Sequence, residues 1–394
     1  MKYRLMKMLL NLRIDRSPIE FKSISGHELS TFDYIHLLWL NDTKFYRALV
    51  SILTCESNGL DAERHCFVSP FGEVISSLEG CRNVYLLNDS ACNGPASFIN
   101  DYGDFGKLIF IHAPFLGRHV LRIKSKYLGK IVWRSWGGRL FYEGEARLSA
   151  KKLAKAVLTP LARRKLQAIR AFGIGNMVDQ IDLERQIGHT RFYRLNYPGE
   201  CTWEIREGIA SEVQAVNRVP RVLIGHSGYT EENHFKIVDR LALYEEKDAE
   251  FLFLLPYGDK TYIKQLKRYA AEKLGLRAIF IEDMKPIENY LRFLNSVDIA
   301  ILDATCSTGL GCFCNLLFFK KKIFVNKAGL YYEALRRCNL PVFASDEIGR
   351  VSWDELLFPP AYPDDYREKD LLPQPYTNAV NCWRRALNEL ACNA

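Results

Sequence analysis

The sequence predicts an α/β protein made of two doubly wound, Rossmann-like halves that face a central cleft. Two observations support this prediction. Short apolar runs alternate with helical patterns along most of the chain, and the alternation restarts after an irregular stretch at residues 198–220. The 394 residues are enough for two domains, and a hydrophobic content of 48% allows each domain to bury a core.

Residues 31–210 are predicted to form the first half, after a basic extension at residues 1–30. Strands are expected in "DYIHLLWL", "HCFVSP", "RNVYLLN", "GKLIFIHAPF" and "KIVWRSWGGRLFYE". A helix is expected in "KFYRALVSILTC", and a basic helix after the fourth strand. The amphipathic run at residues 146–171 predicts a long helix, which Pro160 should kink or divide. A strand, an acidic helix and another strand follow.

Residues 211–375 are predicted to form the second half. This half opens with the strand "RVLI", the turn "GHSG" and a helix. Further strands are expected in "EFLFLLPYG", "LRAIFIED", "DIAILDA", "KKIFVNK" and "LPVFAS", separated by helical patterns. A last helix, at residues 376–394, is expected to pack back on the first half.

The composition excludes several classes of protein. No stretch of about 20 uncharged apolar residues predicts a transmembrane helix, and the basic N-terminus has no cleavage signal of a secreted protein. Eleven scattered cysteines argue against a disulfide framework. The closest group, Cys306, Cys312 and Cys314, lacks the paired spacing of a zinc site and has no nearby histidine. We therefore expect neither a metal nor another cofactor.

Positive charge is concentrated in one segment. Residues 118–170 contain fifteen Lys and Arg but only two acidic residues, a net charge of +13, whereas the whole chain carries +8. Such asymmetry suggests an anionic partner, the alternative being a solvated basic face. No recognised DNA- or RNA-binding motif accompanies the segment, so a nucleic acid is not the expected partner.

The loops that follow the strands of the second half are the candidate binding site, because open parallel sheets bind ligands beyond the carboxyl ends of their strands. Glycines and hydroxyl side chains before a helix leave backbone N–H groups open to an anion. The stretch "DATCSTGLGCFCN" is such a loop, although it is no Walker A loop, and a tight packing turn is the alternative. The candidate residues are Gly225, His226, Ser227, Gly228, Tyr257, Gly258, Met284, Thr305, Ser307, Thr308, Gly309 and Gly311.

The order of several motifs resembles one family. These motifs are "NDTKF", "WRSWGGRLF", "LIGHSGYTEENH", "LLPYGDKTYIKQL", "MKPIENYLRFLNSVDIAIL" and "GLGCFCNLLFFKKKIFVNK". Their order is similar to that of the bacterial 4-acetamido-4,6-dideoxygalactose (Fuc4NAc) transferases, also called the 4-alpha-L-fucosyltransferase family, of enterobacterial common antigen synthesis. The resemblance spans residues 34–343. It implies a GT-B glycosyltransferase that moves a deoxysugar from a nucleoside diphosphate, dTDP in known members, to a polyprenyl-pyrophosphate-linked saccharide at the cytoplasmic face of the membrane.

The resemblance also implies roles for individual residues. The nucleotide-sugar donor would lie on the second half without an obligatory metal, with Glu288 at the ribose. Asp42 and His112, at strand ends of the first half, are the candidate bases for the acceptor hydroxyl; a helix N-cap and a core histidine are the alternatives. The basic segment would dock on the lipid-linked acceptor and the anionic membrane. Its candidate residues are Trp133, Arg134, Trp136, Arg139, Lys151, Lys152 and Lys155, with core positions as the alternative for the tryptophans.

One departure from the family affects the donor loop. Where the family usually has an Arg-Gln-Gln-Ala-x-Gly-Asn run, this chain has Cys306-Ser307-Thr308-Gly309-Leu310-Gly311-Cys312. An arginine in this run could pair bidentately with a diphosphate. Its absence leaves two alternatives: a hexosyltransferase of the same fold that uses a GDP- or UDP-sugar, or a scaffold subunit without activity. His226 is expected to face the donor, and His234 to lie on a helix surface.

Overall fold

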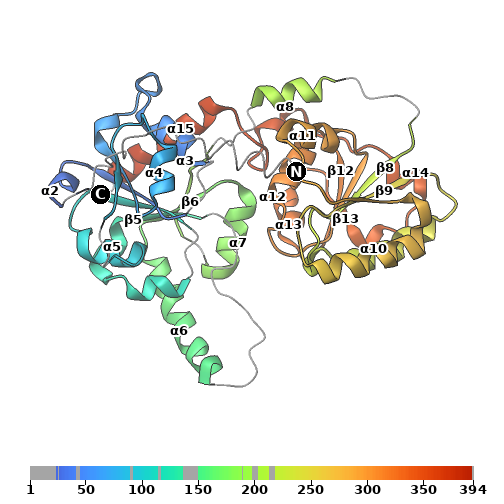
Figure 1. Ribbon diagram of the computed structural model, residues 1–394, viewed down its shortest axis with the longest axis horizontal. Coiled ribbons are helices and arrows are strands. Elements are labelled where there is room, and N and C mark those ends of the chain that lie inside the picture. The colour runs from blue at the N-terminus through green and yellow to red at the C-terminus, as the bar shows by residue number, and fades with distance from the viewer. Residues whose placement is uncertain are drawn as a thin grey trace, which may run out of the picture.

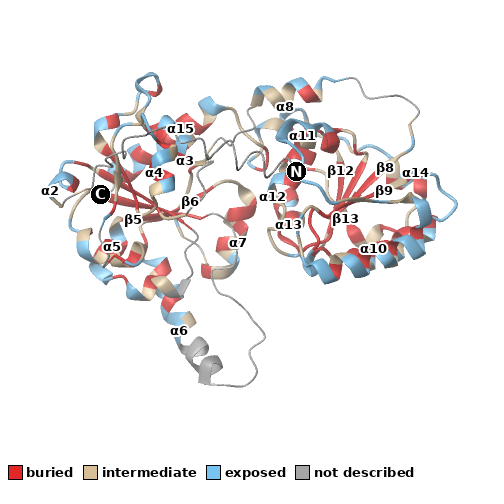
Figure 2. Ribbon diagram, viewed as in Figure 1, coloured by how far each residue is buried: buried red, intermediate tan, exposed pale blue. Residues whose placement is uncertain are grey.

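The computed structural model describes residues 24, 26–40, 45–88, 92–113, 117–135, 150–188, 190–197, 203–212 and 218–392, with the backbone alone at 117–118 and 150–157. Within these residues the chain forms two parallel sheets, one in each half (Figure 1). Figure 2 shows that the strands of both sheets are largely buried. The predicted α/β class with two doubly wound halves is confirmed.

The first sheet has seven parallel strands in the order β3-β2-β1-β4-β5-β6-β7. They are β1 (Tyr34–Leu38), β2 (His65–Ser69), β3 (Val84–Leu86), β4 (Leu108–His112), β5 (Ile131–Arg134), β6 (Ala171–Ile174) and β7 (Phe192–Arg194). Both faces of the sheet are buried: Ile35 and Leu37 belong to one hydrophobic core, and Tyr34 and Leu38 to the other. Burial on both faces explains why these strands are apolar throughout rather than alternating.

Helices of the first half cover both faces of this sheet. They are α2 (Gly26–Leu29), α3 (Tyr46–Thr54), α4 (Gly72–Ser77), α5 (Pro95–Tyr102), α6 (Ala150–Gln167) and α7 (Met177–Ile187). Figure 1 shows α6 projecting away from the body of this half.

One local prediction for the first half was wrong. The basic helix expected after β4 is instead two 3₁₀ segments, Gly117–Arg122 and Ser125–Lys130, because Lys124 between them is extended. Pro160 does not divide α6. It lies on an exposed part of the helix, where water can bond the carbonyl that a proline leaves unpaired.

The second sheet has six parallel strands in the order β10-β9-β8-β11-β12-β13. They are β8 (Arg221–Ile224), β9 (Glu250–Leu254), β10 (Ala278–Ile281), β11 (Ile299–Leu302), β12 (Lys322–Val325) and β13 (Phe343–Ala344). The remaining helices are α8 (Trp203–Ala210), α9 (His234–Leu241), α10 (Lys260–Leu274), α11 (Ile287–Asn295), α12 (Leu310–Phe318), α13 (Leu330–Arg337), α14 (Trp353–Leu357) and α15 (Tyr376–Cys392).

Two helices cross the sequence boundary between the halves. Helix α8 was assigned to the first half by the predicted boundary at residue 210, but it packs against α11, and the Asn295 side chain donates to the Ile209 carbonyl at 2.8 Å. The second half therefore includes α8. Helix α15 packs against α3 and β7 of the first half, and its Trp383 is fully buried there.

The two halves also contact each other through α7 and α13. Arg337 of α13 pairs with Glu184 of α7 at 2.7 Å, and Arg185 of α7 pairs with Glu333 of α13 at 2.5 Å. These ion pairs are partly exposed, so each contributes little to stability on its own.

Candidate functional site

The order of strands changes direction at equivalent points in the two sheets. In the second sheet this switch point lies between β8 and β11, and in the first between β1 and β4. Connections leave a switch point toward opposite faces of the sheet, which opens a crevice beyond the strand ends where ligands bind. The loops that follow β8 and β11, residues 225–233 and 303–309, border this crevice in the second half.

The two loops meet at His226. Its Nδ1 lies 2.5 Å from Glu232 Oε1, and its Nε2 lies 3.2 Å from the Thr308 hydroxyl oxygen. Ser227 donates a further hydrogen bond to Glu232 Oε1 at 3.3 Å. Glu232 is 2% exposed and His226 5% exposed, whereas Thr308 is half-buried at the surface of the loop. The result is a continuous chain from a buried carboxylate through an imidazole to a surface hydroxyl.

Gly309 fixes the position of the imidazole ring. It has a φ of +72°, and a Cβ at this position would lie 2.5–2.7 Å from three ring atoms of His226. Only glycine combines this backbone conformation with such a close approach. Gly311, two residues later in the first turn of α12, has open space where its Cβ would lie. The two glycines of "TGLG" therefore have different roles.

A second close approach joins the loops after β8 and β9. Gly228 and Gly258 form a parallel bridge, in which Gly228 N–H donates to the Tyr257 carbonyl at 2.7 Å and Asp259 N–H donates to the Gly228 carbonyl at 3.0 Å. A Cβ on Gly258 would lie 2.4 Å from the Gly228 backbone. Next to this bridge, the rings of Tyr229 and Tyr257 lie 6.3 Å apart, and each side chain is 46% exposed.

The loop after β11 is anchored at its base by the buried Asp303, and the rest of the loop is partly exposed to solvent. Asp303 is fully buried and accepts hydrogen bonds from Lys236 at 2.9 Å and from Asn326 at 3.2 Å. The loop above it is half-buried or exposed, and the predicted residues there are Thr305, Ser307, Thr308, Gly309 and Gly311. Helix α12 starts at Leu310, so its first N–H groups, which have no partner within the helix, lie at this crevice.

The cysteines of this region do not form a metal centre. Among the described residues, no group of three or more His, Cys, Asp or Glu side chains is placed to hold a metal ion. Burial raises the pKa of the Cys312 and Cys314 thiols to about 12. In the absence of a metal ion these thiols stay protonated at neutral pH.

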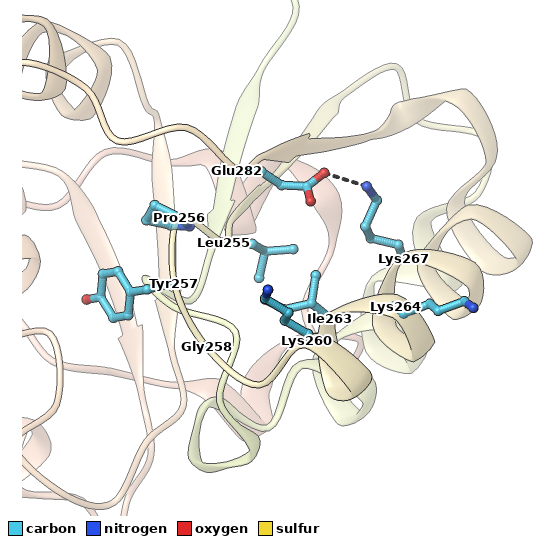
Figure 3. Close-up of a pocket in the computed structure, with 9 residues that line it drawn as sticks. All are labelled: Leu255, Pro256, Tyr257, Gly258, Lys260, Ile263, Lys264, Lys267 and Glu282. Atoms are coloured by element: carbon cyan, nitrogen blue, oxygen red, sulfur yellow. Dashed lines mark hydrogen bonds and ion pairs between the residues drawn. The ribbon is translucent and has the colours of Figure 1, made fainter. Parts of the chain in front are cut away.

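A cavity of about 450 Å³ extends the site along α10. Figure 3 shows Lys260 and Lys267 on the helix side of this cavity and Glu282, at the end of β10, opposite them; Lys267 and Glu282 form an ion pair. Lys264 also lines the cavity, so its rim carries three lysines and one glutamate. Tyr257 points away from these lysines, toward the other side of the loop.

Two predicted donor residues lie on the next loop and helix. Met284 is 74% exposed in the connection between β10 and α11. Glu288, in the first turn of α11, pairs with Arg292 of the same helix at 3.5 Å, and its side chain is 55% exposed. Glu288 thus forms a surface ion pair, and no contact among the described residues joins it to His226 or Thr308.

The first-half candidate His112 is buried in a row of histidines. His112 Nε2 lies 3.0 Å from His36 Nδ1, and His36 Nε2 lies 2.9 Å from His65 Nδ1, so the row crosses β4, β1 and β2. The other nitrogen of His112 bonds the Tyr197 hydroxyl, and no part of His112 is exposed. With both ring nitrogens occupied, His112 is placed as a core histidine and is not presented to an acceptor. The other candidate base, Asp42, lies outside the described residues.

Burial holds this row of histidines neutral. It lowers the pKa of His65 and of His112 to about 3, and it lowers the pKa of His36 well below the usual value. In a neutral row, the N–H group of each imidazole can donate a hydrogen bond to the acceptor nitrogen of the next. The row therefore joins three adjacent strands of the first sheet, β2, β1 and β4.

Two residues predicted for the acceptor face are instead interior. Trp133 is 1% exposed and donates its indole N–H to the Ala113 carbonyl at 3.0 Å. Arg134 is 8% exposed, donates to the Leu195 carbonyl at 2.8 Å and lies 3.7 Å from Asp179. Both point into the sheet core because β5 is a central strand covered on both faces.

The structure does not describe the side chains of the other acceptor candidates. Trp136 and Arg139 lie outside the described residues. Lys151, Lys152 and Lys155 lie on α6, where only the backbone is described.

Sequence reasoning missed the acidic partner of the site and misplaced a histidine. Glu232 was not among the predicted site residues, yet it is the buried partner of His226. His234 was expected on a helix surface but is fully buried, with Nδ1 3.2 Å from the Tyr262 hydroxyl. As the first residue of α9, it is directed inward against Gly225 of the preceding loop and Tyr262 of α10.

Comparisons with known proteins agree with this architecture. A family model described as 4-alpha-L-fucosyltransferase, glycosyl transferase group 56, matches residues 107–354. No curated protein sequence matches significantly. Among solved structures, a glycosyltransferase from Rickettsia africae ESF-5 is 14% identical with a TM-score of 0.52, covering 92% of this chain and 100% of that one. Sucrose-phosphate synthase from Thermosynechococcus elongatus is 11% identical with a TM-score of 0.54, also covering 92% and 100%. At such identities these likenesses show the fold alone, which is GT-B.

Proposed function

Because this chain belongs to the 4-alpha-L-fucosyltransferase family, glycosyl transferase group 56, we propose that it moves a deoxysugar from a nucleoside diphosphate to a lipid-linked saccharide. The sugar is of the Fuc4NAc or fucose kind, the nucleotide is dTDP, and the acceptor is a polyprenyl-pyrophosphate-linked saccharide of a bacterial surface polysaccharide. The family resemblance expected from the order of motifs is confirmed. The donor, the acceptor and the pathway are our proposals.

The observation that carries the proposal is the crevice between β8 and β11. One wall is the loop after β11, whose glycines leave the N-terminus of α12 uncovered. The other wall is the loop after β8, which Glu232 holds in place. Open N–H groups and hydroxyls there suit a diphosphate, and the half-exposed Tyr229 and Tyr257 offer ring faces to a sugar or base. The cavity lined by Lys260, Lys264 and Lys267 lies beside Gly258 and adds positive charge at this end of the sheet.

For the chemistry, we propose an inverting transfer that needs no metal ion. Backbone dipoles and cations stabilise the charge on the leaving diphosphate, and a base of the first half takes the acceptor proton. His112 is fully buried with both ring nitrogens bonded, so we propose the other candidate, Asp42, as the base. An Asp42→Asn variant that still transferred sugar would remove this assignment.

Nucleotide binding tests the proposal. We expect dTDP to raise the melting temperature more than UDP or GDP, since a ligand at 100 times its dissociation constant adds about 2.7 kcal/mol of stability. A larger shift with UDP or GDP would identify a hexosyltransferase with another donor. No shift with any nucleotide would reject the proposal and favour a scaffold without activity.

The membrane-facing part of the proposal rests on α6. Among the described residues, no helix is long and apolar enough to cross a membrane. Helix α6 projects from the first half and exposes the apolar residues Leu158 (46%) and Leu161 (50%) beside the exposed Arg163 and Arg164. We propose that this helix docks the enzyme peripherally on the anionic cytoplasmic face of the membrane, where a lipid-linked acceptor is held. Nucleic acid is not a proposed partner.

Reversing the charge of Lys151, Lys152 and Lys155 to glutamate is expected to weaken binding to vesicles that contain anionic lipid. Each basic residue near such a surface contributes about 1 kcal/mol, so the triple variant should bind at least 100-fold more weakly. Co-sedimentation at two salt concentrations measures the effect. The matched control reverses Lys247, Arg268 and Lys273, which are exposed on the second half. Equal binding by both variants would assign docking to another surface.

A further inference from the structure

The buried chain that joins Glu232, His226 and Thr308 has one proton position that a ligand can change. Glu232 is buried, and its second oxygen, Oε2, has no hydrogen-bond partner. Its first oxygen accepts from His226 Nδ1–H at 2.5 Å. A buried carboxylate is costly unless an opposite charge or hydrogen-bond donors lie beside it, and His226 is its closest partner.

Counting protons gives two states of the chain. In the neutral imidazole, Nδ1 carries the proton that goes to Glu232, so Nε2 can only accept, and the Thr308 hydroxyl must donate to it. The Thr308 oxygen then offers only lone pairs to a ligand. In the imidazolium, both nitrogens donate, Thr308 accepts from Nε2–H, and its own proton is free to point into the crevice.

A diphosphate distinguishes these two states, because its oxygens are ionised and can only accept hydrogen bonds. We propose that binding of a nucleoside diphosphate at this crevice is coupled to uptake of one proton by His226, with Glu232 as the positioning residue and Thr308 as the group that touches phosphate. This inference rests on the proposed function, since it requires the diphosphate to lie between the loops after β8 and β11.

Among the residues that the structure describes, few other ionisable groups face His226. Apart from Glu232, they are Tyr257, whose ring centroid lies 6.2 Å away, and His234, whose charge would act on it through space. Burial lowers the pKa of His234 to about 3, so His234 stays neutral and does not compete for the proton. Cys312 and Tyr331 interact with Glu232 at longer range, and burial raises both of their pKa values.

His234 and Gly225 complete the support of the positioning residue. His234 Nε2 is also buried without a partner, and it faces the same space above Gly225 as Glu232 Oε2. A Cβ on Gly225 would lie 2.4 Å from His234 Nε2 and 3.2 Å from Glu232 Oε2. The glycine therefore keeps this polar space open next to the carboxylate.

The proton balance of the transfer agrees with this role. The bond between the sugar C1 and the diphosphate oxygen breaks, the bond between C1 and the acceptor oxygen forms, and the acceptor proton goes to the base. The departing diphosphate keeps the bonding electron pair and gains one negative charge. A Thr308 hydroxyl polarised by a cationic His226 donates its hydrogen bond where that charge develops.

Titration calorimetry of dTDP with the full-length protein tests the inference. Repeating the titration at pH 8 in buffers of different ionisation enthalpy gives the number of protons taken up for each dTDP bound. At this pH a terminal phosphate, with a pKa of about 6, is fully ionised. We expect net uptake of about one proton for each dTDP bound. Absence of binding overturns the proposed function and the relay together. Binding without proton uptake overturns the relay alone.

Variants assign the proton to a residue. His226→Gln supplies a permanent N–H donor near Nε2 and should keep affinity within about tenfold while proton uptake disappears. Glu232→Gln should reduce the uptake by removing the negative partner. Proton uptake that persisted in His226→Gln would place the proton elsewhere and overturn the inference.

Two isosteric variants at positions outside the buried interior provide a test that does not depend on how a buried substitution affects folding. Thr308→Val removes only a hydroxyl on a half-exposed loop and should lower both the affinity and the proton uptake. Thr230→Val makes the same change at an exposed position of the neighbouring loop and should alter neither. Equal proton counts in these two variants would contradict the role of Thr308.

Discussion

Gly309→Ala is expected to weaken nucleotide binding by at least about 30-fold while the protein stays folded. The new Cβ would lie within 2.5–2.7 Å of three His226 ring atoms, so the ring or the loop must move. Overpacking of this kind costs about 1–3 kcal/mol, and an alanine at φ +72° costs a further 1–2 kcal/mol or so. Because His226 links the two loops of the crevice, either movement separates the carboxylate chain from Thr308.

Gly311→Ala is the matched control for this variant. It makes the same chemical change two residues away, at a position with open space around the new Cβ. We expect it to lose clearly less nucleotide affinity, measured by calorimetry, than Gly309→Ala loses. Equal loss of affinity in both variants would show that general disturbance of the loop, and not the contact with His226, is responsible.

Acidification from pH 7 to pH 5 is expected to lower the free energy of unfolding of the first half by about 2 kcal/mol for each of His65 and His112. The folded pKa of His65 and of His112 is about 3, and that of His36 is also depressed by burial. The unfolded histidines titrate near 6.5, so below that pH protons bind the unfolded chain preferentially. Stability is therefore greatest above about pH 6.5 and falls continuously as the pH drops toward 3.

Tryptophan fluorescence in urea titrations measures this effect, since Trp383 of α15 lies 6.2 Å, between ring centroids, from both His36 and His112. His65→Gln should reduce the loss of unfolding free energy between pH 7 and pH 5 by the contribution of one histidine. His27→Gln, at an exposed position, should leave it unchanged. A urea midpoint that stays constant between pH 7 and pH 5 would contradict the neutral state of the row.

Much of the fold follows from periodicity alone. Strands such as β4 are uniformly apolar because helices cover both faces of each sheet, and each apolar run is followed by a helical pattern. The boundary near α8 could not be read in this way. That helix is amphipathic like its neighbours, and only its contacts with Asn295 and Asn315 show that it packs on the second half.

The site was predictable in part. The glycines and hydroxyls of the loops after β8 and β11 have a recognisable pattern, so Gly225, His226, Thr308 and Gly309 could be named from the sequence. The partnership of His226 with Glu232 depends on how the loop turns back on itself, and the approach of Gly309 depends on two loops 80 residues apart. Neither leaves a local pattern in the chain.

The first half shows the opposite error. His112 follows an apolar strand, and a strand end is a usual place for a catalytic side chain, which made it a candidate base. A histidine inside an apolar strand, His36, is the signal that was available for the alternative, because a buried imidazole needs hydrogen-bond partners. The structure supplies them from β2 and β4.

Hydrogen exchange with and without dTDP tests the central claim, that the switch point of the second sheet binds the nucleotide. We predict slower amide exchange at residues 225–233 and 304–312 when dTDP is bound, with little change in the strands of the first half. Protection confined to other segments, with these two loops exchanging as before, would contradict the assignment of the donor site.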